Sequence, residues 1–388
     1  MTRLYLLEPD DVDGSWAPFA GVRPIAELRA GAWLIRERWE AALGLEASAI
    51  LSAPLAGFSD TAHPPVIAPD AASGPAWVVR ADVVPARAPI APAGQARCLM
   101  MDGRPVGWRL DAGQRWAGAV SDGPGHDITG MHLRGSWDLV TALEQLLGTD
   151  AEEFLKAGSD PIPPGVIVLG DPSRVVLLDA QVEPGTVFDT RQGAVVLMEG
   201  VVVRSGTRLE GPLVAGPGTF LLGGQIRHAS FGPQCRVNGE ISTSVFVGFA
   251  NKSHDGFVGH SVLGHWVNLG AGTTTSNLKN TYGEVRLDGP GGRHPTGRTQ
   301  LGSLIADHAK TAIGSLLGTG TTIGAAASVV GAAGIPRHVP PFAWGLDGER
   351  LTEEGFVRIA ERVLPRRGIT LTADRLASLR ALHRRHVA

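Results

Sequence analysis

The chain has 388 residues, of which 43% are hydrophobic and 19% are charged, so its composition excludes an intrinsically disordered protein. The formal net charge is −3 and no polybasic segment occurs, which argues against a nucleic-acid or membrane partner. The two cysteines, Cys98 and Cys235, are too few for a disulfide framework or a four-thiolate zinc site. The acidic N-terminal residues lack an apolar signal core, which predicts a cytoplasmic protein.

Residues 1–150 are expected to form an α/β domain, because strand-like and helix-like segments alternate. The expected elements, in chain order, are a strand over residues 4–7, a helix that starts at Pro24 and places Ile25, Leu28, Ile35 and Trp39 on one face, strands over 77–79 and 98–101, and a helix over 137–147. Residues 151–165, rich in Gly and Pro, are expected to be a linker.

A six-residue repeat dominates residues 166–340. The expected inward positions are Phe257, Leu263, Leu269 and Thr275, then in the same phase Ile305, Thr311, Leu317, Ile323 and Val329, and with looser spacing Leu197, Val203, Leu209, Val214, Phe220, Ile226, Phe231 and Val237. A period of six fits neither an amphipathic helix nor an alternating strand, and it predicts a parallel β-helix of hexapeptides. A Gly-rich β-sandwich is the alternative. The uncharged run 311–336 shares this period and is rich in Gly and Thr, so a membrane helix is rejected.

Two segments depart from the repeat. Residues 276–304 form a polar insertion, and such insertions usually lie at the surface and often carry function. Residues 341–388 are expected to form a helical tail with helices starting near Thr352 and Thr372, most simply a cap on the solenoid.

Polar side chains gather just before and within this insertion, and three of the four lysines of the chain, Lys252, Lys279 and Lys310, lie in this region. His254 is the candidate general base, because acyl transfer to an amine requires removal of an ammonium proton and an imidazole accepts protons near pH 7. Asn amides or backbone N–H groups are suited to the developing oxyanion, and lysines to phosphate oxygens. A structural histidine at a corner of the coil is the alternative for His254.

The segment from Asn268 to Asn280, NLGAGTTTSNLKN, resembles the acetyltransferase signature of the bacterial bifunctional enzymes that make UDP-N-acetylglucosamine. These enzymes combine a glucosamine-1-phosphate acetyltransferase with an N-acetylglucosamine-1-phosphate uridylyltransferase, and their catalytic histidine lies fourteen residues before the signature Asn, which is the position of His254 here. Tyrosines of the family pattern are replaced by Phe257 and Leu278.

The resemblance implies a left-handed β-helix, a homotrimer, and acetyl-CoA bound between subunits. In the implied site His254 is the base. The residues implied to bind the sugar phosphate are Asn251, Lys252 and Asn268, and those implied to bind acetyl-CoA are Ala271, Asn277, Lys279 and Lys310. The implied acceptor is glucosamine 1-phosphate or a similar amino sugar.

The first domain resembles a divergent branch of the sugar nucleotidyltransferases through the stretch from Pro18 to Gly31, Asp102-Gly103-Arg104, and the stretch from Ser136 to Leu139. The Gly-rich phosphate loop of that family is missing. Arg23-Pro24 stands where the family has a basic residue next to a proline, downstream of that loop. The resemblance implies Arg23 and Arg104 as nucleotide-binding residues and Asp102 as a ligand of Mg2+. A structural role in turns is the alternative for Arg23 and Asp102.

Two other functions fit the same scaffold. Hexapeptide-repeat carbonic anhydrases hold zinc with three histidines, two of which are five residues apart. His260 and His265 have this spacing, but the distance of His228 from them along the sequence does not suit the third ligand. The chain could instead be a non-catalytic trimeric scaffold that binds a sugar nucleotide.

Overall fold

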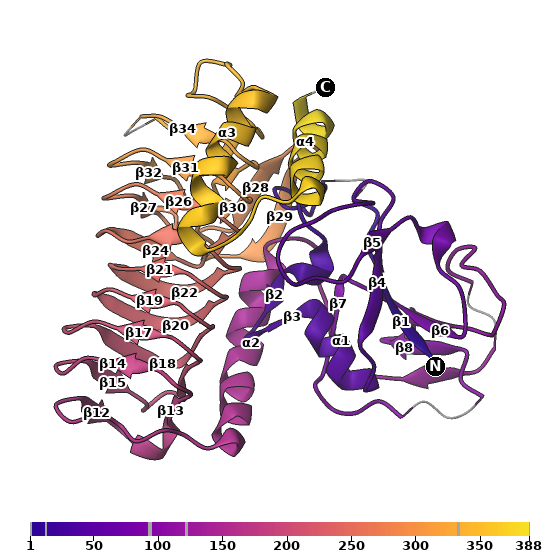
Figure 1. The fold of residues 1–388 in the computed structure, drawn as a ribbon, viewed down its shortest axis with the longest axis horizontal. Helices are drawn as coiled ribbons and strands as arrows, with labels where there is room; N and C mark the ends of the chain where they lie inside the picture. Colours follow the sequence, from indigo (N-terminus) through magenta and orange to yellow (C-terminus); the bar gives the residue numbers. More distant parts are fainter. Residues whose placement is uncertain (1, 12–13, 92–94, 121–122, 332–333, 388) are drawn as a thin grey trace.

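The computed structural model describes residues 2–11, 14–91, 95–120, 123–331 and 334–387. It consists of an N-terminal α/β domain, a long parallel β-helix and two C-terminal helices, which confirms the predicted fold class (Figure 1). The N-terminal domain lies along one side of the β-helix, and the C-terminal helices lie across the end of the β-helix and beside the N-terminal domain.

The N-terminal domain is built on a seven-stranded sheet in the order β10-β8-β9-β6-β1-β4-β5. Its strands are β1 (Arg3–Leu7), β4 (Ala47–Leu51), β5 (Val66–Ile67), β6 (Ala76–Arg80), β8 (Cys98–Met101), β9 (Arg104–Leu110) and β10 (Gly125–Asp127). β1 pairs in parallel with both β4 and β6, whereas β9 runs antiparallel to β6 and β8. The predicted strands at 4–7, 77–79 and 98–101 are therefore confirmed.

The single helix predicted from Pro24 is wrong. This segment instead contains the short 3-10 helix η1 (Ile25–Glu27), the small hairpin of β2 (Arg29–Ala30) and β3 (Trp33–Leu34), and α1 (Ile35–Leu43). Gly31 makes the hairpin turn at φ +71°, and a Cβ there would collide with the Asp150 carboxylate. The predicted apolar residues are nevertheless buried, because both pieces pack into the same core.

Helix α2 (Asp138–Glu153), followed by η3 (Phe154–Ala157), joins the two large parts of the molecule. It packs along β18, β20 and β22 of the β-helix and also contacts β2 of the N-terminal domain (Figure 1). Past α2, Ser159 and Asp160 already hydrogen-bond to the backbone of β13. Apolar residues of α2 and of the solenoid surface therefore form one continuous core.

The β-helix has three faces, each a ladder of short parallel strands. The first face contains β12 (Ile167–Leu169), β15 (Val187–Asp189), the start of β18 (Arg208–Ala215), the start of β20 (Gln225–Phe231), the start of β22 (Glu240–Phe246), β24 (Phe257–Gly259), β27 (Thr274–Thr275) and β32 (Leu316–Leu317). The second face contains β13 (Val175–Leu177), β16 (Val195–Leu197), the ends of β18, β20 and β22, β25 (Val262–Leu263), β30 (Leu304–Ile305), β33 (Thr322–Ile323) and β35 (His338–Val339). The third face contains β14 (Gln181–Val182), β17 (Val202–Val203), β19 (Phe220–Leu221), β21 (Arg236–Val237), β23 (Asn251–Lys252), β26 (Asn268–Leu269), β31 (Lys310–Thr311) and β34 (Ser328–Val329).

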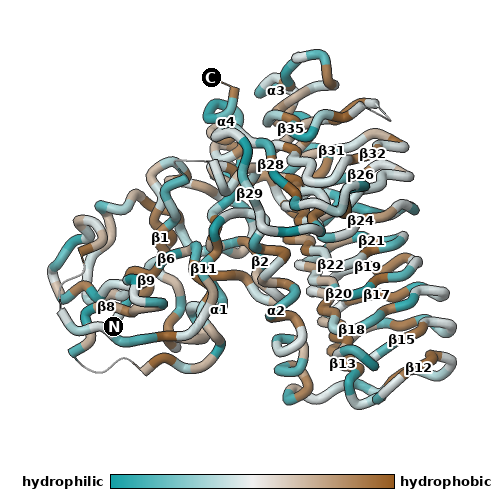
Figure 2. The backbone as a smooth tube through the Cα atoms, turned by 180° about the vertical axis from the view of Figure 1, so that it is seen from behind, coloured by the Kyte–Doolittle hydropathy of each residue, from teal (hydrophilic) through white to brown (hydrophobic). Residues whose placement is uncertain are grey.

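Inward side chains from the three faces fill the interior of the coil, which Figure 2 shows as a stack of regular turns. The predicted inward residues from Leu263 to Val329 are all buried. Phe257 and Phe220 were assigned wrongly, because their neighbours Val258 and Leu221 are the buried ones. Val214 is buried on the outside of the second face, in the core shared with α2, and Leu213 and Ala215 point inward. The run 311–336 contributes β31 to β34, and no helix in the described part of the chain is long and apolar enough to cross a membrane.

The polar insertion contains a hairpin of β28 (Val285–Gly289) and β29 (Gly292–Arg298). It packs between the β-helix and the N-terminal domain, so the expectation of a surface insertion is only partly correct (Figure 1). The ring of His294 stacks on Trp137 with 6.0 Å between centroids, and Arg298 Nη2 lies 2.7 Å from Glu144 Oε1 of α2. Tyr282, before the hairpin, remains exposed.

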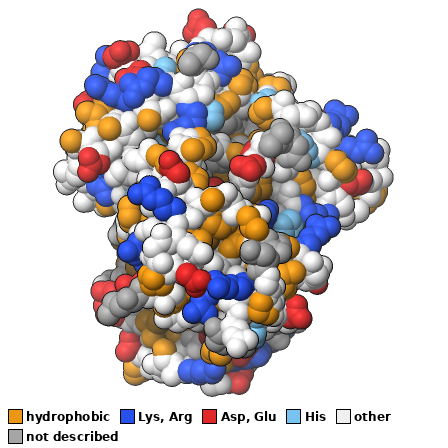
Figure 3. Space-filling model, turned by 90° about the vertical axis from the view of Figure 1, so that its right-hand side faces the viewer, with side chains coloured by type: hydrophobic (Ala, Val, Ile, Leu, Met, Phe, Trp, Pro, Cys, Tyr) orange, Lys and Arg blue, Asp and Glu red, His pale blue; other side chains and the backbone are white. Residues whose placement is uncertain are grey.

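The tail forms α3 (Glu353–Val363), η5 (Leu364–Arg367) and α4 (Ala373–Val387), as predicted. Thr352 caps α3, because its hydroxyl accepts a hydrogen bond from the backbone N–H of Gly355. η5 lies over the third face, and α4 contacts the N-terminal domain through Arg385, which donates to the Gly21 carbonyl. On the side of the molecule seen in Figure 3, basic and acidic side chains are interspersed rather than gathered into one patch.

Candidate functional site

His254 lies at an exposed corner of the β-helix, in the turn between β23 and β24. We call the turn between the third and first faces the open corner, which comprises residues 253–256, 270–273 and 312–315 in successive coils. In Figure 1 this corner is the edge of the β-helix away from the N-terminal domain. The imidazole of His254 makes no hydrogen bond within the described part of the chain, so its ring nitrogens are accessible to a bound molecule.

The open corner carries a small residue directly above His254 and exposed apolar residues beyond it. Gly272 N–H donates to Asp255 O, which places Ala271 directly over His254, one coil spacing of about 4.8 Å away. In the next coil Ile313 occupies the equivalent position and is 78% exposed, and Val330 in the coil beyond is 58% exposed. Exposed apolar side chains beside a polar site are typical of a surface that another chain covers.

Asn251, Asn268 and Lys310 form an outward-facing ladder on the third face, because β23, β26 and β31 pair in register at these residues. Asn251 Nδ2 donates to Asn268 Oδ1 at 2.7 Å, and Ser253 Oγ donates to Asn251 Oδ1 at 2.6 Å. These bonds fix both amide groups and leave Asn268 Nδ2 to donate to a ligand. The structure therefore brings together three of the residues that the sequence predicted for binding.

The ladder forms the floor of a pocket of about 290 Å³, and the roof is supplied by η5 through Arg366 and Arg367. Burial lowers the pKa of Lys310 to about 8, and Arg367 has an Nε that is buried without a hydrogen-bond partner. Arg236 lies one coil below Asn251, and burial followed by repulsion from Arg367 lowers its pKa to about 10. A pocket with this surplus of positive charge is suited to a phosphate group.

Arg366 and Arg367 were not among the predicted site residues. They follow α3 in a tail that the sequence indicated only as a cap, and nothing in their spacing links them to a strand more than 50 residues away. Two adjacent arginines after the predicted apolar helix face were the available signal.

Lys252 was predicted to bind the sugar phosphate at the surface, but the structure places it inside the coil. It is the inward residue of β23, between Val237 and Leu269 in the interior of the coil, and it is fully buried. Its Nζ donates to the carbonyls of Asn238 and His254, and burial lowers its pKa to about 8. Lys252 therefore supports the backbone of the open corner from inside and cannot touch a sugar phosphate outside.

Asn277 and Lys279 lie away from His254 within one chain. Asn277 Nδ2 is 2.8 Å from His260 Nδ1 at the other end of the first face, close to α2. Lys279 Nζ donates to the carbonyl of Glu284, within the insertion. Neither side chain lines the pocket beneath η5.

The residues predicted for nucleotide binding are not grouped together. Arg23 is 2% exposed and forms ion pairs with Asp60 and Asp307, so it is not free to neutralise a triphosphate. Asp102 and Arg104 lie at the exposed turn between β8 and β9, and no group of three or more metal-ligating side chains occurs among the residues that the structure describes. These residues do not identify a magnesium site.

The histidines considered for zinc are also separated. His265 Nδ1 is 2.8 Å from Asp60 Oδ2, whereas His260 bonds to Asn277. His228 is half-buried, and its Nε2 is buried without a hydrogen-bond partner among the described residues. Burial lowers the pKa of His260 to about 4, as expected for a neutral structural imidazole.

Comparison with known proteins finds one family model and several bifunctional relatives. Residues 5–159 match the family model described as sugar nucleotidyl transferase. A bifunctional sugar-1-phosphate nucleotidylyltransferase/acetyltransferase of Sulfurisphaera tokodaii is 36% identical over 100 residues, which cover 26% of this chain and 25% of that protein. The bifunctional protein GlmU of a Nostoc species is 28% identical over 234 residues, covering 55% and 47%, and that of Synechococcus elongatus is 31% identical over 126 residues, covering 32% and 24%. The chain spans less than half the length of these curated relatives.

Proposed function

We propose that this chain, a divergent relative of the bifunctional nucleotidylyltransferase/acetyltransferases, has an acetyltransferase site at the open corner of its β-helix. The substrates are acetyl-CoA and an amino sugar phosphate such as glucosamine 1-phosphate, and the enzyme works in the cytoplasm in UDP-N-acetylglucosamine synthesis. The observation that carries the proposal is the position of His254, which is exposed and stacked under Ala271 beside the Asn251–Asn268–Lys310 ladder.

In the proposed reaction the sugar amine attacks the carbonyl carbon of the acetyl thioester. His254 accepts the proton that the ammonium group must lose, the C–S bond breaks, and the CoA thiolate leaves and takes up a proton. Asn268 Nδ2 is available to donate to the sugar, because its Oδ1 is already occupied by Asn251. The small side chain of Ala271, stacked over His254, leaves room for the thioester to approach the imidazole.

The pocket beneath η5 is proposed to hold the phosphate of the acceptor through Lys310, Arg366 and Arg367. A charge-assisted hydrogen bond contributes about 1.5–3 kcal/mol, so replacing Lys310 with Met is expected to raise KM for glucosamine 1-phosphate by about 10- to 100-fold. The same substitution is expected to leave KM for acetyl-CoA within about twofold, and steady-state kinetics with each substrate varied in turn measures both values. An equal rise in both KM values would contradict the assignment.

The pH dependence of acceptor binding tests the same pocket. The pKa of Lys310 is lowered to about 8, so its charge is present below pH 8 and is lost as the pH rises through that value. The ratio of kcat/KM between the wild type and Lys310→Arg is therefore expected to fall by about tenfold from pH 7 to pH 9.5, since arginine stays charged. A ratio that stays constant over this range would show that Lys310 does not bind the phosphate.

A second copy of the chain is proposed to cover the open corner, giving a homotrimer whose sites lie between neighbouring β-helices. Asn277 and Lys279 would reach acetyl-CoA only from such a neighbour. Ile313→Asp places a charge on the exposed apolar edge, and it is expected to give monomers with less than about 1% of wild-type acetyl transfer while leaving the chain folded.

The matched control is Val120→Asp, which changes an exposed apolar residue of the N-terminal domain. Sedimentation velocity and circular dichroism of both variants separate loss of assembly from loss of folding. A monomeric Ile313→Asp variant with full activity would show that one chain is sufficient.

Nucleotidyl transfer to a sugar 1-phosphate is proposed as a second activity, because residues 5–159 match the sugar nucleotidyl transferase model. A pocket of about 410 Å³ lies at the carboxyl ends of β1 and β4, where ligands commonly bind to α/β sheets. Release of pyrophosphate from UTP and N-acetylglucosamine 1-phosphate in the presence of Mg2+ tests this activity. Absence of both activities would favour the non-catalytic scaffold.

A further inference from the structure

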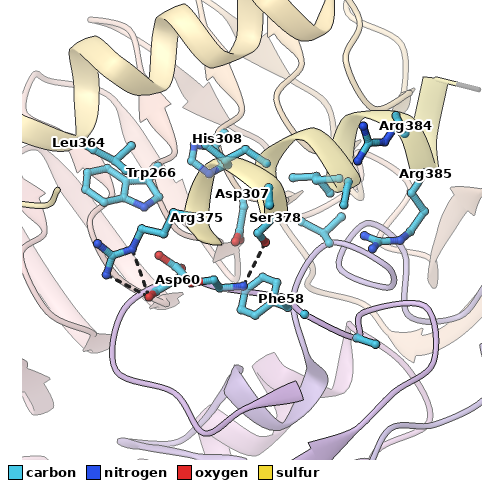
Figure 4. Close-up of a pocket in the computed structure, with 18 residues that line it drawn as sticks. Phe58, Asp60, Trp266, Asp307, His308, Leu364, Arg375, Ser378, Arg384 and Arg385 are labelled. Carbon is cyan, nitrogen blue, oxygen red and sulfur yellow. Dashed lines mark hydrogen bonds between the residues drawn. The ribbon is translucent and has the colours of Figure 1, made fainter. Parts of the chain in front are cut away.

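A second pocket lies where the three parts of the molecule meet, and it belongs to neither proposed active site. It has a volume of about 300 Å³ and is shown in Figure 4. One wall is the loop from Ala56 to Asp60 of the N-terminal domain, the floor is the corner of the β-helix at Trp266 and His308, and the remaining wall is α4. Its size is that of pockets which hold small organic ligands.

One face of α4 lines this pocket along its whole length. Arg375, Ser378, Leu379, Leu382 and Arg385 follow the helical spacing of three and four residues, so they project to the same side. Apolar residues occupy the middle of the trough and arginines occupy both ends, with Arg384 next to Arg385 (Figure 4).

Arg375 and Arg385, at the two ends of the trough, hydrogen-bond to backbone carbonyls. Arg375 donates to the carbonyls of Asp60 and Thr370, and Arg385 donates to the carbonyl of Gly21. In the described part of the chain neither guanidinium forms an ion pair with an acidic side chain, and burial lowers the pKa of Arg385. Arg384 lies at the solvent edge, and its Nη1 makes a long ion pair of 4.0 Å with Glu353 Oε2.

The two acidic side chains of the pocket, Asp60 and Asp307, share one arginine and are outnumbered by the three arginines of α4 that line it. Arg23 forms an ion pair with both Asp60 and Asp307, and His265 bonds to Asp60. Burial would raise the pKa of Asp60, but Arg23 and His265 hold it well below the usual range. The charge left over in the trough is therefore positive.

Two neutral polar groups also face the trough. Ser378 Oγ accepts a hydrogen bond from the Ser59 N–H at 3.1 Å, which leaves its own O–H to donate. The His308 ring contacts Trp266 and Phe356, and in the described part of the chain no side-chain hydrogen bond involves it. Burial lowers the pKa of His308 to about 4, so its neutral ring offers one donor and one acceptor.

We propose that this junction trough binds a small ligand with a planar heterocyclic ring and a phosphate head, of the size of a nucleoside monophosphate. Arg384 and Arg385 hold the phosphate, and the ring lies against Phe58 and Leu382, within reach of His308. The ligand contacts the N-terminal domain, the β-helix and α4 together, so it fastens the tail to the rest of the chain. Trp266 borders both this trough and the pocket of the acetyltransferase site, and Leu364 of η5 lines the trough two residues before Arg366. Occupancy of the trough therefore fixes the position of Arg366 and Arg367.

The binding experiment uses uridine 5′-monophosphate, with uridine and inorganic phosphate as its two halves, in isothermal titration calorimetry on the full chain. The monophosphate is expected to bind at least tenfold more tightly than either half, because the trough has both an apolar middle and a cationic end. Arg385→Gln is expected to weaken binding at least tenfold, and Ala381→Phe, which fills the trough, is expected to abolish it. Arg358→Gln, which changes an exposed arginine of α3 outside the trough lining, is expected to leave binding unchanged.

Acetyl transfer without the monophosphate is expected to stay at the wild-type rate in Arg385→Gln and Ala381→Phe, so failure of this proposal is distinguishable from failure of the acetyltransferase proposal. Absence of binding by the wild type would overturn the proposal. Binding that is equal in wild type, Arg385→Gln and Ala381→Phe would place the nucleotide elsewhere, for example at the carboxyl ends of β1 and β4, and would also overturn it.

Discussion

Replacement of His254 by Ala is expected to lower kcat for acetyl transfer by about 100- to 10,000-fold, the usual contribution of a positioned general base. The loss is expected in kcat rather than in KM, because the phosphate is held by Lys310, Arg366 and Arg367 and the sugar by Asn268. Stability is expected to change by less than about 0.5 kcal/mol, because the imidazole is exposed and makes no hydrogen bond within the described part of the chain. Detection of the released CoA thiol measures the rate directly.

His126→Ala is the matched control, since His126 lies on β10 at the edge of the N-terminal sheet, far from the open corner along the chain and in the fold. It is expected to keep wild-type kinetics. A His254→Ala enzyme that retains more than about a tenth of the wild-type kcat would assign the proton transfer to another group.

Replacement of Arg23 by Met is expected to destabilise the junction between the N-terminal domain and the β-helix by about 3–5 kcal/mol, the usual effect of removing one partner from a buried ion pair. Arg23 Nε is 3.0 Å from Asp307 Oδ2, and the same guanidinium also pairs with Asp60. Without it, two largely buried carboxylates lose their shared cation, although His265 still bonds to Asp60. The urea midpoint, followed by tryptophan fluorescence, measures the loss.

Two further variants identify the cause. Arg104→Met removes an arginine from the exposed turn between β8 and β9 and is expected to shift the midpoint by the equivalent of less than about 0.5 kcal/mol. Adding Asp60→Asn and Asp307→Asn to Arg23→Met is expected to recover part of the loss, because the unpaired charges are then removed. A midpoint for Arg23→Met equal to that of the wild type would show that the network does not hold the two parts together.

The repeat region was predictable because a solenoid is a local structure. Each inward residue from Leu263 to Val329 is set by a period that the sequence repeats, and all of them are buried. The errors at Phe257, Phe220 and Val214 have two physical causes. Aromatic side chains also occur on the outward side of short strands, and the outside of the second face is itself apolar where α2 covers it.

The site was predictable only in part. The register of β23, β26 and β31 places Asn251, Asn268 and Lys310 on one face, whereas the sequence assigned them to binding only through the family resemblance. Lys252 follows Asn251 directly and therefore points to the opposite side of its strand, into the coil. Arg23, Arg366 and Arg367 depend on contacts between distant segments, and no local pattern in the sequence encodes those contacts.

The most direct test of the central claim is a crystal structure of the assembled protein with acetyl-CoA and glucosamine 1-phosphate. The proposal predicts the thioester carbonyl at the open corner, with the sugar nitrogen within hydrogen-bond distance of a His254 imidazole nitrogen, the phosphate against Lys310, and a second chain closing the corner. Acetyl-CoA bound on another surface, with His254 left in solvent, would contradict it.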